Sequence, residues 1–480
     1  MKRVYLLTWL ALSLVPVKHT NAQQSTSATF TLEQCIEYAL QNSINAQNAT
    51  LDQRIAAAKV KETIGLGLPQ ISADASLIHN PKLQRFFTTY TPGGGFFDFS
   101  GVPGIQPGDV LGAKNFFQLQ SAGSASATLN QLIFNGSYIV GLQASRTFKE
   151  LSAKTAIQTR EQIVQQVTKA YYAVLINNER TDLFTNNIAR VDSLLRNTKA
   201  LNQNGFAEGI DVDRIQVTLN NLKTERDKFL KLNDLGLELL KFQMNYPMDQ
   251  PITILGSIQV VQVDTNLENY KQGWDYKQRP DYQVLEVNKK LQELNIRNQY
   301  AGAMPSINAF ATLGYSTQSP NVSGLFKTNS GINDEGGVGP DKWYNFSQIG
   351  LSLNYPLFTG LQRHYKIQQE KLTLIKVENG FRSLKNGIDL EIKQSSIQFE
   401  NALNTLTSQK ENMELAAKVA RVTRIKYEQG VGSNLEVVDA ENSLRQAQTN
   451  YYSALFDAMI AKVDLDKAYG KLLPQIKNDK

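Results

Sequence analysis

The chain has 480 residues, with 50 lysines and arginines against 44 aspartates and glutamates, and a formal net charge of +6 at pH 7. Charges so nearly balanced over this length are not those of an obvious nucleic-acid-binding protein. The single cysteine, Cys35, excludes an intramolecular disulfide bond, and we expect it to be a half-buried residue of a helix.

A secretory signal peptide is predicted over residues 1–22. Lys2 and Arg3 precede an apolar run at residues 4–17, and a small-residue exit follows at Asn21–Ala22. The run is too short for a membrane span and has the flanks of a cleaved leader. Its removal lowers the net charge to about +3. We therefore expect an exported protein.

Four strands are predicted downstream, over residues 69–79, 121–134, 305–317 and 346–358. In each of them apolar and polar side chains alternate, and two of them begin at Pro69 and Pro305. A period of two predicts strands with one apolar and one polar face. Segments rich in Gly, Pro and Asp separate the paired strands, at residues 80–120 and 319–344, and are predicted to be loops.

Two long helical hairpins are predicted, at residues 137–245 and 361–470, each interrupted by a glycine-containing turn. No proline occurs between residues 137 and 202. About 65 helical residues at about 1.5 Å each extend roughly 100 Å, a length that no compact core requires. In the last helix, apolar side chains recur at spacings of 3 and 4 from Leu444 to Ala468, which predicts a heptad seam.

The order of the segments predicts an internal two-fold repeat. Three landmarks occur twice in the same order: "GLGLPQISADAS" and "AGAMPSINAFAT", "LNQLIFNG" and "LSLNYPLFTG", "NQNGFAEGIDVDR" and "YEQGVGSNLEVVD". We assign the first repeat to residues 23–270, with an equatorial segment at 246–272. The second repeat covers residues 273–480 and ends in a C-terminal tail. A difference in length between the halves lies in a predicted loop.

The strands have the length needed to cross an outer membrane, and no apolar run downstream of residue 22 has the roughly 18 residues of a spanning helix. Aromatic residues near the strand ends are typical of the interfacial girdle of a β-barrel, although they would be core residues in a soluble sandwich. Four strands cannot close a barrel, since known barrels begin at about eight and open edges leave backbone groups unsatisfied in lipid. Several copies must therefore share one barrel, which indicates a conduit.

Five stretches carry a resemblance to a known family: "FTLEQCIEYALQNS", the strand starts at Pro69 and Pro305, "QRPDYQVLE", "LFTG" and "YEQGVGSNLEVVDAENSLRQAQ". In this order they resemble the TolC-like outer-membrane efflux proteins, or outer membrane factors, over essentially the whole mature chain. The resemblance implies a homotrimer with a twelve-stranded outer-membrane β-barrel, four strands per chain, continued by a long periplasmic α-helical coiled-coil barrel.

The function that this resemblance implies is that of the exit duct of a tripartite efflux system. Its partners would be other copies of the chain, the lipid of the outer membrane, a periplasmic adaptor of the membrane fusion protein type and an inner-membrane transporter. The repeated motifs "LIFNG" and "LFTG" then mark the two places where a strand is followed by a helix. These strand-to-helix transitions are at Phe134 and Gly136 and at Phe358 and Gly360.

By the same resemblance the glycine turns are the periplasmic tips where an adaptor docks. The tip residues are Gly205, Gly209, Gly430, Gly432 and Ser433. Two nearby acids match the residues that line the periplasmic aperture in the family, Glu436 and Asp439. Three copies of each would form carboxylate rings that favour cations. As residues of a single helix they read equally well as first-turn carboxylates that favour a helix N-terminus.

Tyr427 and Asp211 match the tyrosine and aspartate that latch neighbouring coils in the closed state of the family. The chain departs from the family pattern at Gly432, where the latch arginine is missing. A charge-assisted hydrogen bond near Asp211 is lost with it. The closed state is therefore expected to be held differently in this protein.

No catalytic constellation is found, and no cofactor or metal is expected. His79 and His364 lack metal-ligand spacing, and Gly93–Gly95 lacks the Lys-Ser/Thr of a phosphate loop. Two other functions remain open: a type I protein-secretion conduit, and a non-conducting coiled-coil scaffold of the envelope. The aromatic loop "PGGGFFDFSGVPG" is predicted to be able to plug the outer mouth of the channel.

Overall fold

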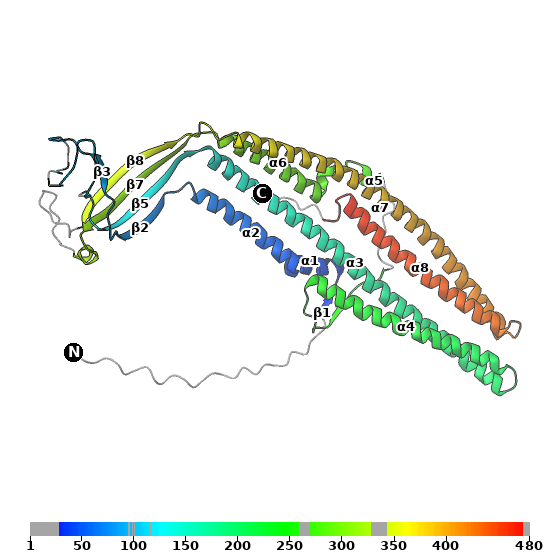
Figure 1. The fold of residues 1–480 in the computed structure, drawn as a ribbon. Coiled ribbons are helices and arrows are strands. Elements are labelled where there is room, and N and C mark those ends of the chain that lie inside the picture. Colours follow the sequence, from blue (N-terminus) through cyan, green and yellow to red (C-terminus); the bar gives the residue numbers. More distant parts are fainter. Residues whose placement is uncertain are drawn as a thin grey trace, which may run out of the picture. The chain divides into compact units, whose positions relative to one another are not determined.

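The computed structural model describes residues 28–258, apart from residues 95, 96, 98, 100 and 116, together with residues 268–327 and 343–473 (Figure 1). The predicted signal peptide, residues 259–267 of the equatorial segment, and parts of both predicted loops lie outside the described residues. Within the described ranges, no helix carries an apolar stretch of the length that a membrane crossing requires.

Long helices account for most of the described chain. In chain order they are α1 (Leu32–Asn42), α2 (Ile44–Gly65), α3 (Gly136–Gln203), α4 (Gly209–Met244), α6 (Pro280–Ala301), α7 (Gln362–Glu428) and α8 (Asn434–Ala468), with a short α5 (Glu268–Lys271) and 3-10 turns at Tyr276–Gln278 and Val322–Phe326. The strands are β1 (Ala28–Phe30), β2 (Gln70–His79), β3 (Phe86–Thr89), β4 (Val110–Ala113), β5 (Ser121–Asn135), β6 (Ile252–Ile254), β7 (Ser306–Ser319) and β8 (Tyr344–Asn354).

The chain divides into two compact units. The sheet unit comprises Gln53–Ser152 and Leu285–Asn379, and the hairpin unit comprises the residues up to Asp52, Ala153–Val284 and those from Gly380 onward. Each unit therefore draws on both predicted repeats. The division between the units does not coincide with the division between the repeats.

The sheet unit is built around a four-stranded antiparallel sheet with the order β2-β5-β7-β8. Its register aligns one apolar row across all four strands, because Ile71 pairs with Leu129, Leu129 with Ala311, and Ala311 with Ile349. Paired residues of an antiparallel sheet point to the same face. Ile71 and Ile349 are 76% and 85% exposed, so this apolar face is uncovered in the single chain.

The opposite face of the sheet is polar. The hydroxyls of Ser76 and Ser124 are 2.8 Å apart, and those of Thr128 and Thr312 are 3.0 Å apart. Hydroxyl pairs across neighbouring strands stabilise their alignment. The period-two pattern of the sequence therefore becomes a sheet with one apolar and one hydrogen-bonding surface.

Two features of this unit differ from the sequence expectation. The fourth strand was predicted to extend to residue 358, but β8 ends at Asn354, because Pro356 lacks the N–H that a continuing ladder requires. The predicted loop at residues 80–120 contains the antiparallel pair of β3 and β4, in which Phe86 lies opposite Ala113. The segment between these two short strands is rich in glycine and proline, so the sequence predicted a loop over the whole region.

Helices of the sheet unit are tied to one another by close packing and by ion pairs. Any side chain at Gly67 would overlap the ring of Tyr138, since a Cβ there would lie 2.3 Å from the tyrosine oxygen. Lys290 of α6 pairs with Glu150 of α3 at 3.0 Å. These contacts hold the start of α3 against α2 and α6.

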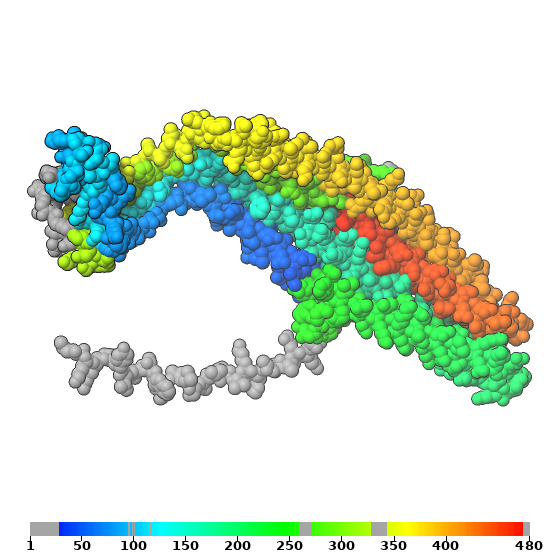
Figure 2. Space-filling view, viewed as in Figure 1, coloured from blue at the N-terminus to red at the C-terminus, as the bar shows by residue number. Residues whose placement is uncertain are grey.

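The hairpin unit has its largest apolar cluster where α1, α3, α4 and α8 meet the short parallel pair of β1 and β6. Cys35, Val167, Leu240 and Met459 are buried there. Burial raises the pKa of the Cys35 thiol to about 12, so the thiol stays protonated. The heptad positions Leu444, Ala454, Ala458, Ala461, Leu465 and Ala468 of α8 are buried as well. Figure 2 shows the surfaces of the two hairpin tips, the α3–α4 tip in green and the α7–α8 tip in orange.

Candidate functional site

The two hairpin turns of the hairpin unit use the same backbone geometry. Gly205 and Gly430 have φ angles of 74° and 72°, in the left-handed region that favours glycine. The N–H of Phe206 donates to the carbonyl of Leu201 at 2.8 Å, and the N–H of Val431 donates to that of Lys426 at 3.0 Å. This six-to-one hydrogen bond is the Schellman arrangement that ends a helix.

The remaining tip glycines have different roles. Gly209 is the first residue of α4, and a Cβ there would meet open space. A Cβ on Gly432 would lie 3.1 Å from the backbone nitrogen of Tyr427 and 3.2 Å from the Cβ of Lys426. The turn is therefore tight around Gly432. An arginine at this position would require the neighbouring backbone to shift.

Ser433 caps the N-terminus of α8. Its Oγ accepts a hydrogen bond from the N–H of Glu436 at 3.2 Å. Glu436 and Asp439 are both exposed and stand three residues apart, so they share one face of α8. Neither carboxylate forms an ion pair with another residue of the described chain. The single chain thus leaves two adjacent negative charges at the start of α8.

The two tips contact each other within the unit. The amide of Asn434 donates to the main-chain carbonyl of Asp211 at 3.3 Å, and Tyr427 Oη lies 3.4 Å from Thr198 Oγ1. The carboxylate of Asp211 pairs instead with Arg214, at 3.7 Å. The two latch candidates, Tyr427 and Asp211, are therefore both at the contact between the tips but are not bonded to each other.

A buried carboxylate that the sequence reading missed joins three helices beside these tips. Glu441 of α8 is 7% exposed. One of its oxygens lies 3.5 Å from Arg190 Nε of α3, and the other accepts a hydrogen bond from Arg424 of α7. The available signal was its position three residues before Leu444, on the apolar seam, because a buried charge requires a partner.

The predicted strand-to-helix transitions differ in structure. Phe134 lies beside a register shift in β5, and Gly136 opens α3 directly, where a Cβ would come within 2.9 Å of the Ala301 carbonyl. In the second half, Phe358 is 80% exposed and a short connection through Gly360, with φ of 58°, leads to α7. The predicted strand starts Pro69 and Pro305 immediately precede β2 and β7, where no ladder N–H is needed.

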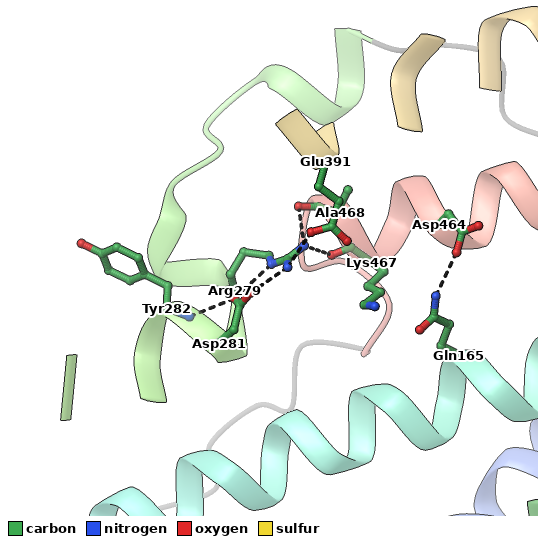
Figure 3. A network of polar contacts seen from close by, with 8 residues as sticks. All are labelled: Gln165, Arg279, Asp281, Tyr282, Glu391, Asp464, Lys467 and Ala468. Atoms are coloured by element: carbon green, nitrogen blue, oxygen red, sulfur yellow. Dashed lines mark hydrogen bonds and ion pairs between the residues drawn. The ribbon is translucent and has the colours of Figure 1, made fainter. Parts of the chain in front are cut away.

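A second polar cluster in the hairpin unit centres on Arg279 of the "QRPDYQVLE" stretch (Figure 3). Its guanidinium donates to the carbonyls of Lys467 and Ala468 at 3.0 and 3.1 Å, and so caps the end of α8. The same group pairs with Asp281 and with Glu391 of α7, each at 2.8 Å. Arg279 therefore fixes the start of α6 to α7 and α8.

Glu161 of α3 is buried near this cluster. Burial raises the pKa of its carboxyl to about 7. The positive charge of Arg279 lowers this pKa, and the negative charge of Asp281 raises it. Lys467 lowers it and Glu391 raises it, both with smaller effects. Burial therefore favours the protonated form of Glu161. Among the described residues, no group of histidine, cysteine and carboxylate side chains is arranged to hold a metal ion.

Several known proteins resemble this chain in sequence and in fold. Residues 276–471 match the family described as outer membrane efflux protein. The outer membrane protein TolC of Vibrio cholerae is 19% identical over 356 residues, which are 73% of this chain and 77% of that protein. The probable efflux pump outer membrane protein TtgC of Pseudomonas putida is 24% identical over 341 residues, 68% of this chain and 64% of that protein.

The crystal structure of the outer membrane protein VceC from Vibrio cholerae matches with a TM-score of 0.66 at 14% identity, over 92% of this chain and 96% of that chain. The fold is therefore shared with VceC, and it combines a small sheet with long helical hairpins. The chain therefore resembles the TolC-like outer-membrane efflux proteins, in sequence over residues 276–471 and in fold over most of its length, and the relatives that it matches are outer-membrane proteins.

Proposed function

We propose that the protein is the outer-membrane exit duct of a tripartite efflux system and acts as a homotrimer. The observation that carries this proposal is the four-stranded sheet, whose apolar face is uncovered and whose edge strands, β2 and β8, have no further strand partner within the described chain. Unpaired edges are unfavourable in lipid. Three sheets joined edge to edge make a twelve-stranded barrel with apolar rows facing lipid.

The long hairpins then continue this barrel as an α-helical tube in the periplasm. The matching turns of the two hairpins support the proposed internal repeat, since both end in the same glycine geometry. A tube of near-equivalent hairpins presents its tips in one ring. We assign the docking of a periplasmic adaptor to these tips, and place an inner-membrane transporter behind the adaptor.

The names of related proteins indicate which cargo the duct carries. A TtgC protein of Pseudomonas putida is named as the outer membrane protein of a toluene efflux pump, which supports small molecules as the cargo here. A type I protein-secretion conduit is the alternative within transport, because the inner-membrane partner selects the passenger. A duct of this kind performs no covalent chemistry, so the protein is proposed not to be an enzyme and to need no cofactor.

The aperture is proposed to lie at Glu436 and Asp439. In a trimer these two exposed acids produce about six carboxylates around the narrow end of the tube. Rings of carboxylates favour the passage of cations over anions. The latch that closes this end is proposed to involve Tyr427 and the residues around Asp211, with the tip contacts described above.

The test is single-channel conductance and ion selectivity in a planar bilayer. The wild-type protein is expected to show a small, cation-selective conductance, and the variant with Glu436→Ser and Asp439→Ser is expected to lose most of that selectivity. A matched variant, Glu208→Ser with Asp213→Ser, removes two carboxylates from the other tip and should retain it. Absence of conductance in correctly inserted protein would instead favour an envelope scaffold.

A further inference from the structure

The four strands of the sheet carry almost no charge. Asp74 of β2 is the only charged side chain within β2, β5, β7 and β8, and it lies opposite Ser126 on the polar face. A basic residue on the lipid face of a strand is costly near the middle of a bilayer. The first basic residues after β2 are therefore notable for their position.

Three basic residues gather just beyond the end of β2. They are Lys82, Arg85 and Lys114, and all three are exposed. Lys82 and Arg85 lie between β2 and β3, and Lys114 directly follows β4. Figure 1 shows β3 at the end of the sheet that is away from the starts of the long helices of the sheet unit. The cations therefore lie at the end of the sheet opposite to α2 and α3.

Hydrogen bonds tie this basic segment to the sheet. The N–H of Asn80 donates to the carbonyl of Gln120 at 2.7 Å, and the side-chain amide of Gln120 donates to the carbonyl of Pro81 at 3.1 Å. Gln120 directly precedes β5. The chain leaving β2 is thus held at the start of β5, and Lys82 is the next residue.

Arg85 and Lys114 are neighbours across the β3–β4 pair. Phe86 lies opposite Ala113, and Arg85 and Lys114 are the next residue on each side of that pair. The guanidinium of Arg85 donates to the carbonyl of Gly112 at 3.2 Å, and a Cβ on this glycine would lie 3.3 Å from Arg85 Cδ. The glycine therefore leaves room for the arginine to lie along β4.

No carboxylate balances these cations within the described chain. The side chains of Lys82 and Lys114 form no ion pair or hydrogen bond with a described residue, and Arg85 uses one of its five N–H donors. Asp109, the acid of this connection that the structure describes, accepts a hydrogen bond from the N–H of Gln106 instead. Like charges side by side on neighbouring strands repel each other. A bound anion would remove this repulsion.

Exposed aromatic rings lie beside the cations. Phe87 and Phe117 are 74% and 64% exposed, and Phe86 packs edge-on against Phe117 with the ring centroids 5.7 Å apart. Aromatic and basic groups together are typical of the level where acyl chains meet lipid head groups. A soluble anion would need the charges but not the rings, so this composition favours a lipid.

We propose that Lys82, Arg85 and Lys114 bind the phosphate groups of an outer-leaflet glycolipid of the lipid A type, with its acyl chains beside Phe87 and Phe117. This inference rests on the proposed position of the sheet in the outer membrane, with the helices on the periplasmic side. That position puts the three cations at the outer surface, in the leaflet that contains phosphorylated glycolipid. The fork of Arg85 suits two oxygens of one phosphate, and the lysines supply point charges.

Binding of purified lipid A to the full-length protein, folded in detergent, tests this site. Native mass spectrometry should show binding of diphosphoryl lipid A, and at least about tenfold weaker binding of the same lipid after removal of both phosphates. This comparison uses the wild-type protein, so it does not depend on the folding of a variant. Excess inorganic phosphate should leave the lipid bound, because the free ion has no acyl chains to place beside the rings.

A triple variant identifies the residues. Lys82→Gln with Arg85→Gln and Lys114→Gln should lower the affinity for diphosphoryl lipid A by at least about tenfold. Replacement of both lysines by arginine keeps the three charges and should keep the affinity. Thermal unfolding followed by circular dichroism establishes that each variant is folded.

The matched control removes the same number of charges elsewhere. Lys199→Gln with Lys223→Gln and Lys231→Gln neutralises three exposed lysines of the hairpin unit that form no salt bridge with a described residue. This variant has the same net charge as the triple variant at the sheet. It should bind diphosphoryl lipid A like the wild-type protein.

Equal affinity for lipid A with and without its phosphates would overturn the proposed site, and so would an unchanged affinity in the folded triple variant. An equal loss in the control would also overturn it, since net charge alone would then attract the lipid. Complete displacement by inorganic phosphate would assign the cations to a free anion instead. Single-channel conductance separates these failures from failure of the proposed function. A conducting protein without the lipid preference rejects only the lipid site, whereas a correctly inserted protein that never conducts rejects the duct.

Discussion

Glu161 is a buried carboxyl whose pKa is raised by burial from 4.5 to about 7. Between these two values the folded protein binds more protons than the unfolded chain. The free energy of unfolding therefore falls as the pH rises through this window, and the loss is complete above it. Glu161 is therefore expected to make the protein more stable at pH 5 than at pH 8.

Substitution Glu161→Gln should remove this dependence and stabilise the protein at pH 8 by roughly 1 to 3 kcal/mol. Thermal unfolding of the detergent-solubilised protein, followed by circular dichroism at both pH values, measures the effect. Glu62→Gln is a suitable control, because Glu62 is an exposed partner of Lys59. A Glu161→Gln variant that is no more stable than the wild type at pH 8 would contradict the prediction.

Glu441 shows how one charge can hold three helices. Replacement by glutamine leaves Arg190 and Arg424 facing each other without their shared counter-charge. Loss of one partner of a buried pair costs about 3 to 5 kcal/mol, and we expect about 1 to 3 kcal/mol here because both arginines are partly exposed. Denaturant unfolding of Glu441→Gln measures it, and Glu436→Gln, at an exposed site, should stay within about 0.5 kcal/mol of the wild type.

A triple replacement separates the charge from the packing. Leucine at positions 190, 424 and 441 removes all the charges together, and apolar replacements of buried ion clusters are often neutral or stabilising. This variant should recover most of the stability that Glu441→Gln loses. Continued instability would mean that the cluster acts through shape and not through charge.

At the scale of elements, the alternation of apolar and polar side chains along each strand gives the sheet one apolar face and one polar face. Leu351 lies opposite Ala309 on the apolar face, and the next residue, Ser352, lies opposite Asn308 on the polar face. Arginine at Leu351 should destabilise the lipid-inserted protein by about 2 to 4 kcal/mol, the magnitude known for a basic residue near the bilayer midplane. Arginine at Ser352 should cost much less.

Folding into phosphatidylcholine vesicles, monitored by the shift of the heat-stable band on a gel, compares these two variants. They differ by one position and introduce the same charge, so composition and strand propensity are matched. Similar losses in both would show that the apolar face does not meet lipid.

Elements with a regular period were accessible from the sequence. β2 and β7 each begin one residue after the predicted start, and three of the four tip glycines, Gly205, Gly430 and Gly432, lie between the helices of their hairpins. The β3–β4 pair was missed because four-residue strands are too short for alternation to stand out from a glycine-rich context. The end of β8 was overestimated because the apolar pattern continues past Pro356 although the hydrogen-bond ladder does not.

At the scale of the whole molecule, the contacts that the sequence did not predict are those between residues far apart in the chain. Tyr427 meets Thr198 across 229 positions, and Glu441 meets Arg190 from a different hairpin. A sequence pattern identifies a charge on an apolar seam, but it does not identify the opposite charge that approaches it. The family resemblance located the turns of both hairpins along the chain, but it did not specify these contacts.

Both compact units are interleaved in sequence, and this has a consequence for biogenesis. The buried cluster around Cys35 includes Met459, and the sheet begun by β2 is completed only by β8. Neither unit can reach its final packing before the last part of the chain has been synthesised. Its apolar faces stay unpaired until then, and exposed apolar surface of this kind makes an incompletely folded chain prone to aggregation.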